Sequence, residues 1–173
     1  DAAEAQAIVN GATYDSTVVG MRSQDSYFYC STGLVFNHFQ SHLIGTGQGL
    51  NFEAMTGAGL SAIKITSSTS QTLQTTTTNT RAFSGFQVQG PSHLVGTTST
   101  GIHIVDLMVD AGSYTIPMVT LRDVNIAGFK YAVQLGNGSF NCVFDNVVIC
   151  NTAVNVLGNG IYCPAATDAG EMH

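Results

Sequence analysis

The candidate catalytic residues of this sequence are three aspartates, Asp106, Asp110 and Asp145. Two carboxylates that flank a glycosidic bond can hydrolyse it, at a separation of about 5 Å for retention and about 6.5–9.5 Å for inversion. Asp106 and Asp110 lie in an insert between two apolar segments. Binding and catalytic residues are frequently found on loops that a rigid scaffold positions. The alternative is ordinary turn chemistry, because Asp110 opens an Asp-Ala-Gly stretch.

An internal repeat gives Asp145 a second interpretation. Residues 119–128 align with residues 142–151 at a constant shift of 23, with apolar residues over apolar residues. At this shift Asp145 falls on Arg122, and Asn146 falls on Asp123. The alternative to catalysis is therefore a surface ion pair, which contributes at most about 1 kcal/mol.

The candidate carbohydrate-binding residues come from short segments that share one pattern, a small residue followed by apolar, polar and apolar residues. The polar positions of 101–104, 132–135 and 153–156 are taken by His103, Gln134 and Asn155. A row of neutral donors and acceptors suits sugar hydroxyls, and without tryptophan the stacking platform would come from Tyr114, Tyr131 or Tyr162. The alternative is an ordinary solvent-facing column or a subunit contact.

The elements that must position these residues are short strands broken by glycine and asparagine, which recur along the chain at shifts between 21 and 23. Such units cannot bury their apolar faces alone and must stack on their neighbours. We therefore predict an all-β fold, a right-handed single-stranded parallel β-helix, because parallel crossovers are nearly always right-handed. The interior columns that we expect are Val88, Ile126 and Ile149; Phe86, Val124 and Val147; and Ile104, Leu135 and Val156.

The composition favours one domain and excludes several classes of protein. The chain has 173 residues, of which 9 % are charged, against roughly 25 % in an ordinary domain. Five Lys and Arg against eleven Asp and Glu cannot make a basic stripe, so we expect no nucleic-acid partner. No apolar run reaches the roughly 20 residues of a membrane helix, so we expect no membrane insertion.

The cysteines give no metal-binding spacing. Cys30, Cys142, Cys150 and Cys163 form no C-x-x-C pair, and we expect neither a metal site nor a cofactor. Four is an even number, so a disulfide stays open, but we favour buried free thiols.

The chain is expected to divide into three segments. Residues 1–43 are a less regular N-terminal cap or connecting segment, and residues 44–163 are the β-helix coils. Residues 164–173 are small and polar and are expected to be a linker or a truncated end. A cap is expected because the end of a solenoid exposes core and strand edges.

Over roughly residues 40–163 the sequence resembles the pectate-lyase-like β-helix superfamily, in particular its phage tailspike and polysaccharide depolymerase type. The resemblance is carried by residues 43–47 (LIGTG), 86–90 (FQVQG) and 124–133 (VNIAGFKYAV), with an echo at 147–154 (VVICNTAV).

The resemblance implies an extracellular module of a virion tail that recognises bacterial surface polysaccharide, forms a homotrimer and contacts other virion proteins. Whether it depolymerises the polysaccharide, as a lyase or a glycoside hydrolase, stays open. The competing hypothesis is a non-catalytic structural component of a virion or adhesin, in which the β-helix is a trimeric spacer.

Overall fold

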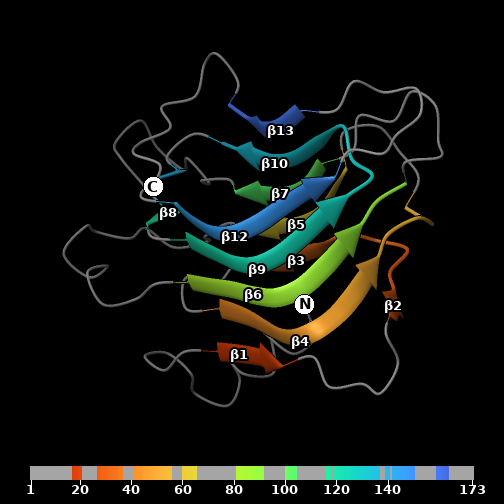
Figure 1. The fold of residues 1–173 in the computed structure, drawn as a ribbon, viewed down its shortest axis with the longest axis horizontal. Coiled ribbons are helices and arrows are strands. Elements are labelled where there is room, and N and C mark those ends of the chain that lie inside the picture. The colour runs from red at the N-terminus through yellow and green to blue at the C-terminus, as the bar shows by residue number, and fades with distance from the viewer. Residues whose placement is uncertain are drawn as a thin grey trace.

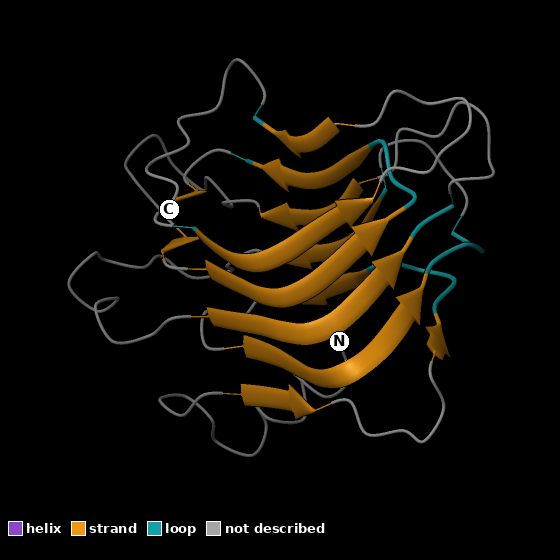
Figure 2. Ribbon diagram, viewed as in Figure 1, coloured by secondary structure: helices purple, strands orange, loops and turns teal. Residues whose placement is uncertain are grey.

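A computed structural model describes eleven stretches of the chain, and all regular elements in them are strands (Figure 2). The described residues are 17–20, 27–36, 41–55, 60–65, 81–91, 100–104, 116–117, 119–136, 139–140, 142–150 and 159–163. The strands are β1 (Thr17–Gly20), β2 (Tyr27–Tyr29), β3 (Leu34–Phe36), β4 (Ser41–Asn51), β5 (Ser61–Ile65), β6 (Arg81–Gln89), β7 (Thr100–Ile104), β8 (Ile116–Pro117), β9 (Val119–Ala127), β10 (Tyr131–Leu135), β11 (Ser139–Phe140), β12 (Val143–Cys150) and β13 (Asn159–Tyr162).

The chain alternates between two parallel sheets that we call sheet A and sheet B (Figure 1). Sheet A has the order β1-β4-β6-β9-β12, with β2 also on β4, and sheet B has the order β13-β10-β7-β5-β3. A small third sheet pairs β8 with β11. Each passage through sheet A and then sheet B completes one coil, so the predicted all-β parallel solenoid is confirmed.

The strand register confirms most of the predicted columns. Val88 pairs with Ile126, which pairs with Ile149, and Ile104 pairs with Leu135. The column of Phe86, Val124 and Val147 is also in register. Neighbouring strands in a sheet lie about 4.8 Å apart, so these side chains stack directly on one another.

Within the described residues, the predicted repeat length of 21 to 23 holds for only two strand pairs of sheet A, β9–β12 and β2–β4, the latter with Tyr27 paired with Gly49 at a shift of 22. Thr120 pairs with Val143 at the expected shift of 23, whereas Arg81 pairs with Val119 at a shift of 38. The additional residues lie in the connections between strands, and the strands themselves stay in register. The predicted period was therefore wrong as a general rule for the described coils.

The predicted strand over residues 153–156 was wrong as the neighbour of β10. The strand that pairs there is β13, which places Tyr162 opposite Gln134, and Asn155 and Val156 lie outside the described residues. The sequence Leu-Gly-Asn-Gly occurs at 135–138 and 157–160, but the first copy ends β10 and the second enters β13. The two copies have the same sequence, but they do not lie on one another in neighbouring coils.

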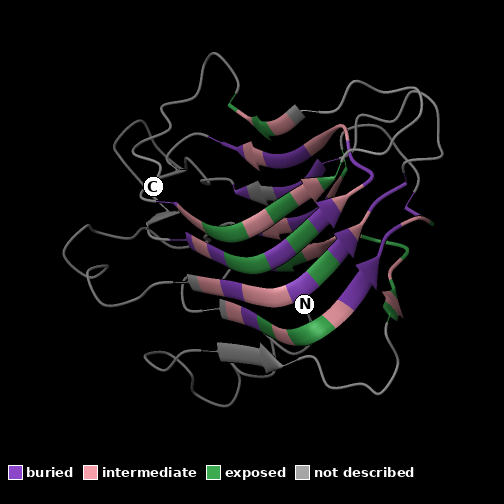
Figure 3. Ribbon diagram, viewed as in Figure 1, coloured by how far each residue is buried: buried purple, intermediate pink, exposed green. Residues whose placement is uncertain are grey.

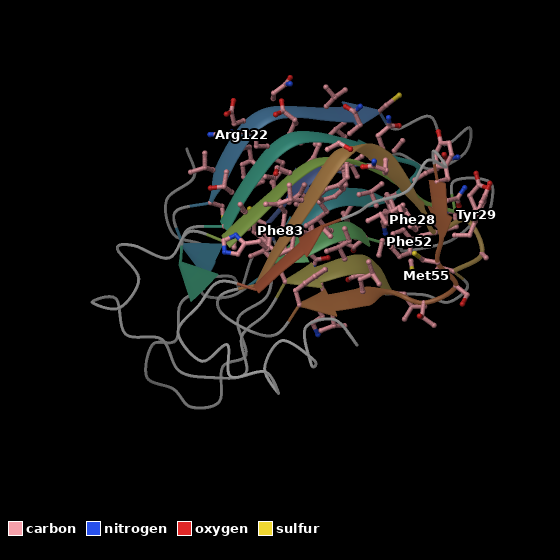
Figure 4. The ribbon with its side chains drawn as sticks, turned by 90° about the horizontal axis from the view of Figure 1, so that it is seen from below. Phe28, Tyr29, Phe52, Met55, Phe83 and Arg122 are labelled. Carbon is pink, nitrogen blue, oxygen red and sulfur yellow. The ribbon has the colours of Figure 1, made fainter. Side chains whose placement is uncertain are left out.

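The core lies between the two sheets and is almost entirely apolar. Alternating buried and exposed positions are visible along β9 and β6 (Figure 3). Phe83 of sheet A and Phe36 of sheet B are both fully buried and pack edge to face, with ring centroids 5.3 Å apart. Phe28, Phe52 and Met55 lie at the same end of the sheets (Figure 4). Phe52 and Met55 are buried, and Phe28 is partly buried against the core.

Sheet A bends along one column of left-handed residues. Asp123 and Asn146 both have φ of 53°, and Gly85, which occupies the same place in β6, has φ of 72°. Asp and Asn adopt this conformation more readily than other side chains, and glycine adopts it freely. A Cβ on Gly85 would lie 2.2 Å from the carbonyl oxygen of Gly45, so this coil requires glycine.

The first strands of the chain belong to the same stack. β1 and β2 pair with β4, and β3 pairs with β5, all in parallel. Residues 164–173, the expected linker, lie outside the described residues.

Candidate functional site

An aromatic pair stands on sheet B. The rings of Tyr131, at the start of β10, and Tyr162, at the end of β13, stack with centroids 4.3 Å apart and planes at 18°. The ammonium of Lys130 lies 5.1 Å from the centre of the Tyr131 ring. A cation at this distance from an aromatic face is stabilised by the ring quadrupole, by about 0.5–1 kcal/mol at an exposed site. All three side chains are half-buried, so this cluster is accessible from solvent.

A polar contact repeats the same geometry one coil earlier. The Thr100 hydroxyl donates to Oε1 of Gln134 at 3.2 Å. Gln134 is opposite His103, three residues beyond Thr100, and Tyr162 is opposite Gln134, three residues beyond Tyr131. In both coils, the fourth residue of one sheet B strand therefore contacts the first residue of the neighbouring strand. Gln134 of β10 contacts Thr100 of β7, and Tyr162 of β13 contacts Tyr131 of β10. We call Thr100, Lys130, Tyr131, Gln134 and Tyr162 the sheet B cluster.

The structure brings together three of the five predicted carbohydrate-binding residues. Tyr131 and Gln134 are in the sheet B cluster, and His103 is the strand neighbour of Gln134. The predicted third member of the polar column, Asn155, is replaced at that position by Tyr162. Asn155 and Tyr114 lie outside the described residues.

Asp145 is the predicted catalytic residue that lies within the described part of the chain, and it is on sheet A. Asp145 lies on β12 and accepts a hydrogen bond from Nε of Arg122 at 2.7 Å, with both side chains more than half exposed. The Nδ2 group of Asn146 donates to Oδ1 of Asp123, also at 2.7 Å. Both predicted contacts across the repeat are therefore confirmed. Arg122 points outward from sheet A, on the side away from sheet B (Figure 4).

Asp145 therefore lies on a different sheet from the sheet B cluster. Its carboxylate forms an exposed ion pair with Arg122, which is the alternative to catalysis stated in the sequence analysis. Asp106 and Asp110, the other catalytic candidates, lie outside the described residues.

The four cysteines are free and differ widely in burial. Cys142 is buried, Cys30 is half-buried, and Cys150 and Cys163 are exposed, so the expectation of buried thiols was wrong for the last two. Burial raises the pKa of Cys142 to about 12, with a smaller contribution from Cys163. Burial also raises the pKa of Cys30. Cys142 is thus a neutral core residue at physiological pH rather than a nucleophile.

Neither a metal-binding cluster nor a membrane-spanning helix is found in the part of the chain that the structure describes. No three His, Cys, Asp or Glu side chains come together there as possible metal ligands. No helix with the length and apolar character needed to cross a bilayer occurs there either.

Two members of the sheet B cluster were missed by sequence reasoning. Lys130 precedes Tyr131 in the segment Phe-Lys-Tyr, and its position next to a candidate stacking residue was the available signal. Thr100 gave no such signal, because its contact with Gln134 depends on a strand register that the uneven coil lengths conceal.

Comparison with known proteins gives no assignment: no protein-family model, no curated protein and no solved structure matches this chain. The class that the fold defines is therefore the parallel β-solenoid, and the function is argued from the surface of this chain alone.

Proposed function

We propose that this chain is a tailspike-like β-helix module that binds bacterial surface polysaccharide on the outer face of sheet B. The observation that carries the proposal is the Tyr131–Tyr162 stack beside the Thr100–Gln134 hydrogen bond. Aromatic rings offer apolar faces to the C–H surface of a sugar, and hydroxyl and amide groups bind its hydroxyls.

The scaffold supports this proposal because it holds the cluster in place. Every strand of sheet B pairs in parallel with its neighbours, and apolar residues such as Ile102, Val133 and Leu135 beneath the cluster are buried. A binding site on strands of a packed scaffold loses little conformational entropy when a ligand binds. The cluster is therefore preorganised for an extended ligand that crosses several coils.

The first test measures binding of immobilised bacterial capsular polysaccharides and lipopolysaccharides by biolayer interferometry. Tyr162→Ala should weaken binding about two- to tenfold, because it removes an aromatic contact of about 0.5–1.5 kcal/mol. Tyr162→Phe keeps the ring and should retain most of the affinity.

A matched control is Tyr29→Ala on β2 of sheet A, where the side chain is 80 % exposed. This variant removes the same groups from the other sheet and should bind like the parent protein. Release of reducing ends in the same samples tests for depolymerisation. If the parent protein binds none of the glycans, the proposal is wrong, and the structural spacer is the remaining hypothesis.

A further inference from the structure

Charge is unevenly divided between the two sheets. The described acidic residues are Glu53, Asp123 and Asp145, which lie on sheet A or directly after one of its strands. The strands of sheet B contain no Asp or Glu at all, although the chain has a net charge of −6. Lys64 lies on β5 of sheet B, and Lys130 lies in the sheet B cluster. The described strands of sheet B therefore carry one lysine and no carboxylate, and Lys130 directly precedes β10.

The two lysines of sheet B are not neutralised by described carboxylates. The ion pair found in this part of the chain is Arg122–Asp145 on sheet A, and neither Lys64 nor Lys130 is within salt-bridge distance of a described acidic side chain. Lys130 contacts the Tyr131 ring, which holds the ammonium without cancelling its charge. Among the described residues, neither charge is therefore cancelled by a carboxylate.

Lys64 also lies in the same row of strand partners as Gln134 and Tyr162 of the sheet B cluster. Lys64 is opposite His103, His103 is opposite Gln134, and Gln134 is opposite Tyr162. At about 4.8 Å per strand this row is about 14 Å long. One extended ligand can therefore contact the charge of Lys64 at one end and the tyrosines at the other.

We infer that the ligand of sheet B is an anionic glycan, one that carries carboxylates or phosphates, rather than a neutral one. This inference rests on the proposed function and adds the charge of the substrate. The tyrosines would bind the sugar faces, and Lys64 and Lys130 would bind the anionic substituents. Opposite charges attract more strongly at a partly desolvated surface than in bulk water, so charge can determine which glycan is preferred.

The test compares polymers of different charge, and one pair of them differs only in the carboxylates. The probes are alginate, alginate whose carboxylates have been reduced to alcohols, a wall teichoic acid as a phosphate-bearing polymer, and dextran as a neutral one. We expect binding to alginate, to teichoic acid or to both, and at least about tenfold weaker binding to reduced alginate and dextran. Binding to the anionic polymers should fall as salt is raised.

Charge-matched variants locate the effect. Lys64→Gln and Lys130→Gln should each weaken binding to the anionic probe about threefold or more. Arg122→Gln changes the net charge equally but lies on sheet A, so it should have no effect. Equal losses in all three variants would mean a general effect of net charge and would overturn the inference.

The outcomes separate this inference from the proposed function. Binding of dextran or reduced alginate as strong as that of the anionic probes, and sensitive to Tyr162→Ala, would keep the binding site and overturn its charge preference. The absence of binding to any of these polymers and to any capsular polysaccharide or lipopolysaccharide would overturn both.

Discussion

The stacking of coils can be tested by one pair of substitutions, Ile126→Ala and Ile149→Ala. The two residues are direct neighbours in one column, on β9 and β12. Ile126 is 1 % exposed, whereas Ile149 is only partly buried because β12 is the edge strand of sheet A. The same chemical change is therefore made in the middle and at the end of one column.

The expected magnitudes follow from burial. Replacing isoleucine by alanine removes three carbons, or about 2.4 kcal/mol at about 0.8 kcal/mol for each buried carbon. At Ile126 the cavity between coils adds to this loss, so we expect about 3–4 kcal/mol. At Ile149 roughly half of the transfer term applies and no closed cavity forms, so we expect about 1 kcal/mol.

Urea denaturation followed by far-ultraviolet circular dichroism measures both losses, since the chain contains no tryptophan. Val148→Ala is the control on β12, because this side chain is 52 % exposed and should change the free energy of unfolding by less than about 0.5 kcal/mol. Equal losses at Ile126 and Ile149, or a larger loss at Ile149, would refute the argument that Ile126 is enclosed between two coils and Ile149 is only partly covered.

Three further predictions concern single residues. Asp145→Asn should lower stability by less than about 1 kcal/mol and leave glycan binding unchanged, as measured by urea denaturation and interferometry. Gly85→Ala should destabilise the protein by more than about 2 kcal/mol on thermal unfolding, because its Cβ would collide with a backbone carbonyl oxygen. The raised pKa of Cys142 stabilises the fold fully below the ordinary value of 9.0, and this contribution is lost as pH rises toward about 12. Cys142→Val should therefore reduce alkaline unfolding, and at pH 8 a thiol reagent should label Cys150 and Cys163 well before Cys142. Rapid labelling of Cys142 in the folded protein would contradict this assignment.

The architecture could be predicted because the apolar columns have a local signal. Alternation around Val124 and Ile126 and its copy at Val147 and Ile149 defines both the strands and their register. The contact of Arg122 with Asp145 follows from the same alignment. Where two coils have nearly equal connections, the sequence therefore contains enough information to place side chains on one another.

The sheet B cluster could be predicted only in part because its coils differ in length. Tyr131 pairs with Asn159 at a shift of 28, whereas the shift of 21 that aligns residues 132–135 with residues 153–156 placed Asn155 where Tyr162 lies. In the observed register Ile161 is the partner of the buried Val133, although Ile161 itself is 43 % exposed. This register depends on tertiary packing rather than on similarity between segments.

The unequal spacing of the coils has a consequence for how such a protein can be altered. Arg81 and Val119 are paired at a shift of 38, whereas Thr120 and Val143 are paired at a shift of 23, with the same strand geometry. Doubling the length of a flexible connection costs only about 0.6 kcal/mol in closure entropy, so the ladder of strands is nearly indifferent to what joins them. Connections of other lengths and sequences can therefore be placed between these strands. The surface that the connections form can then vary while the paired strands beneath it stay unchanged.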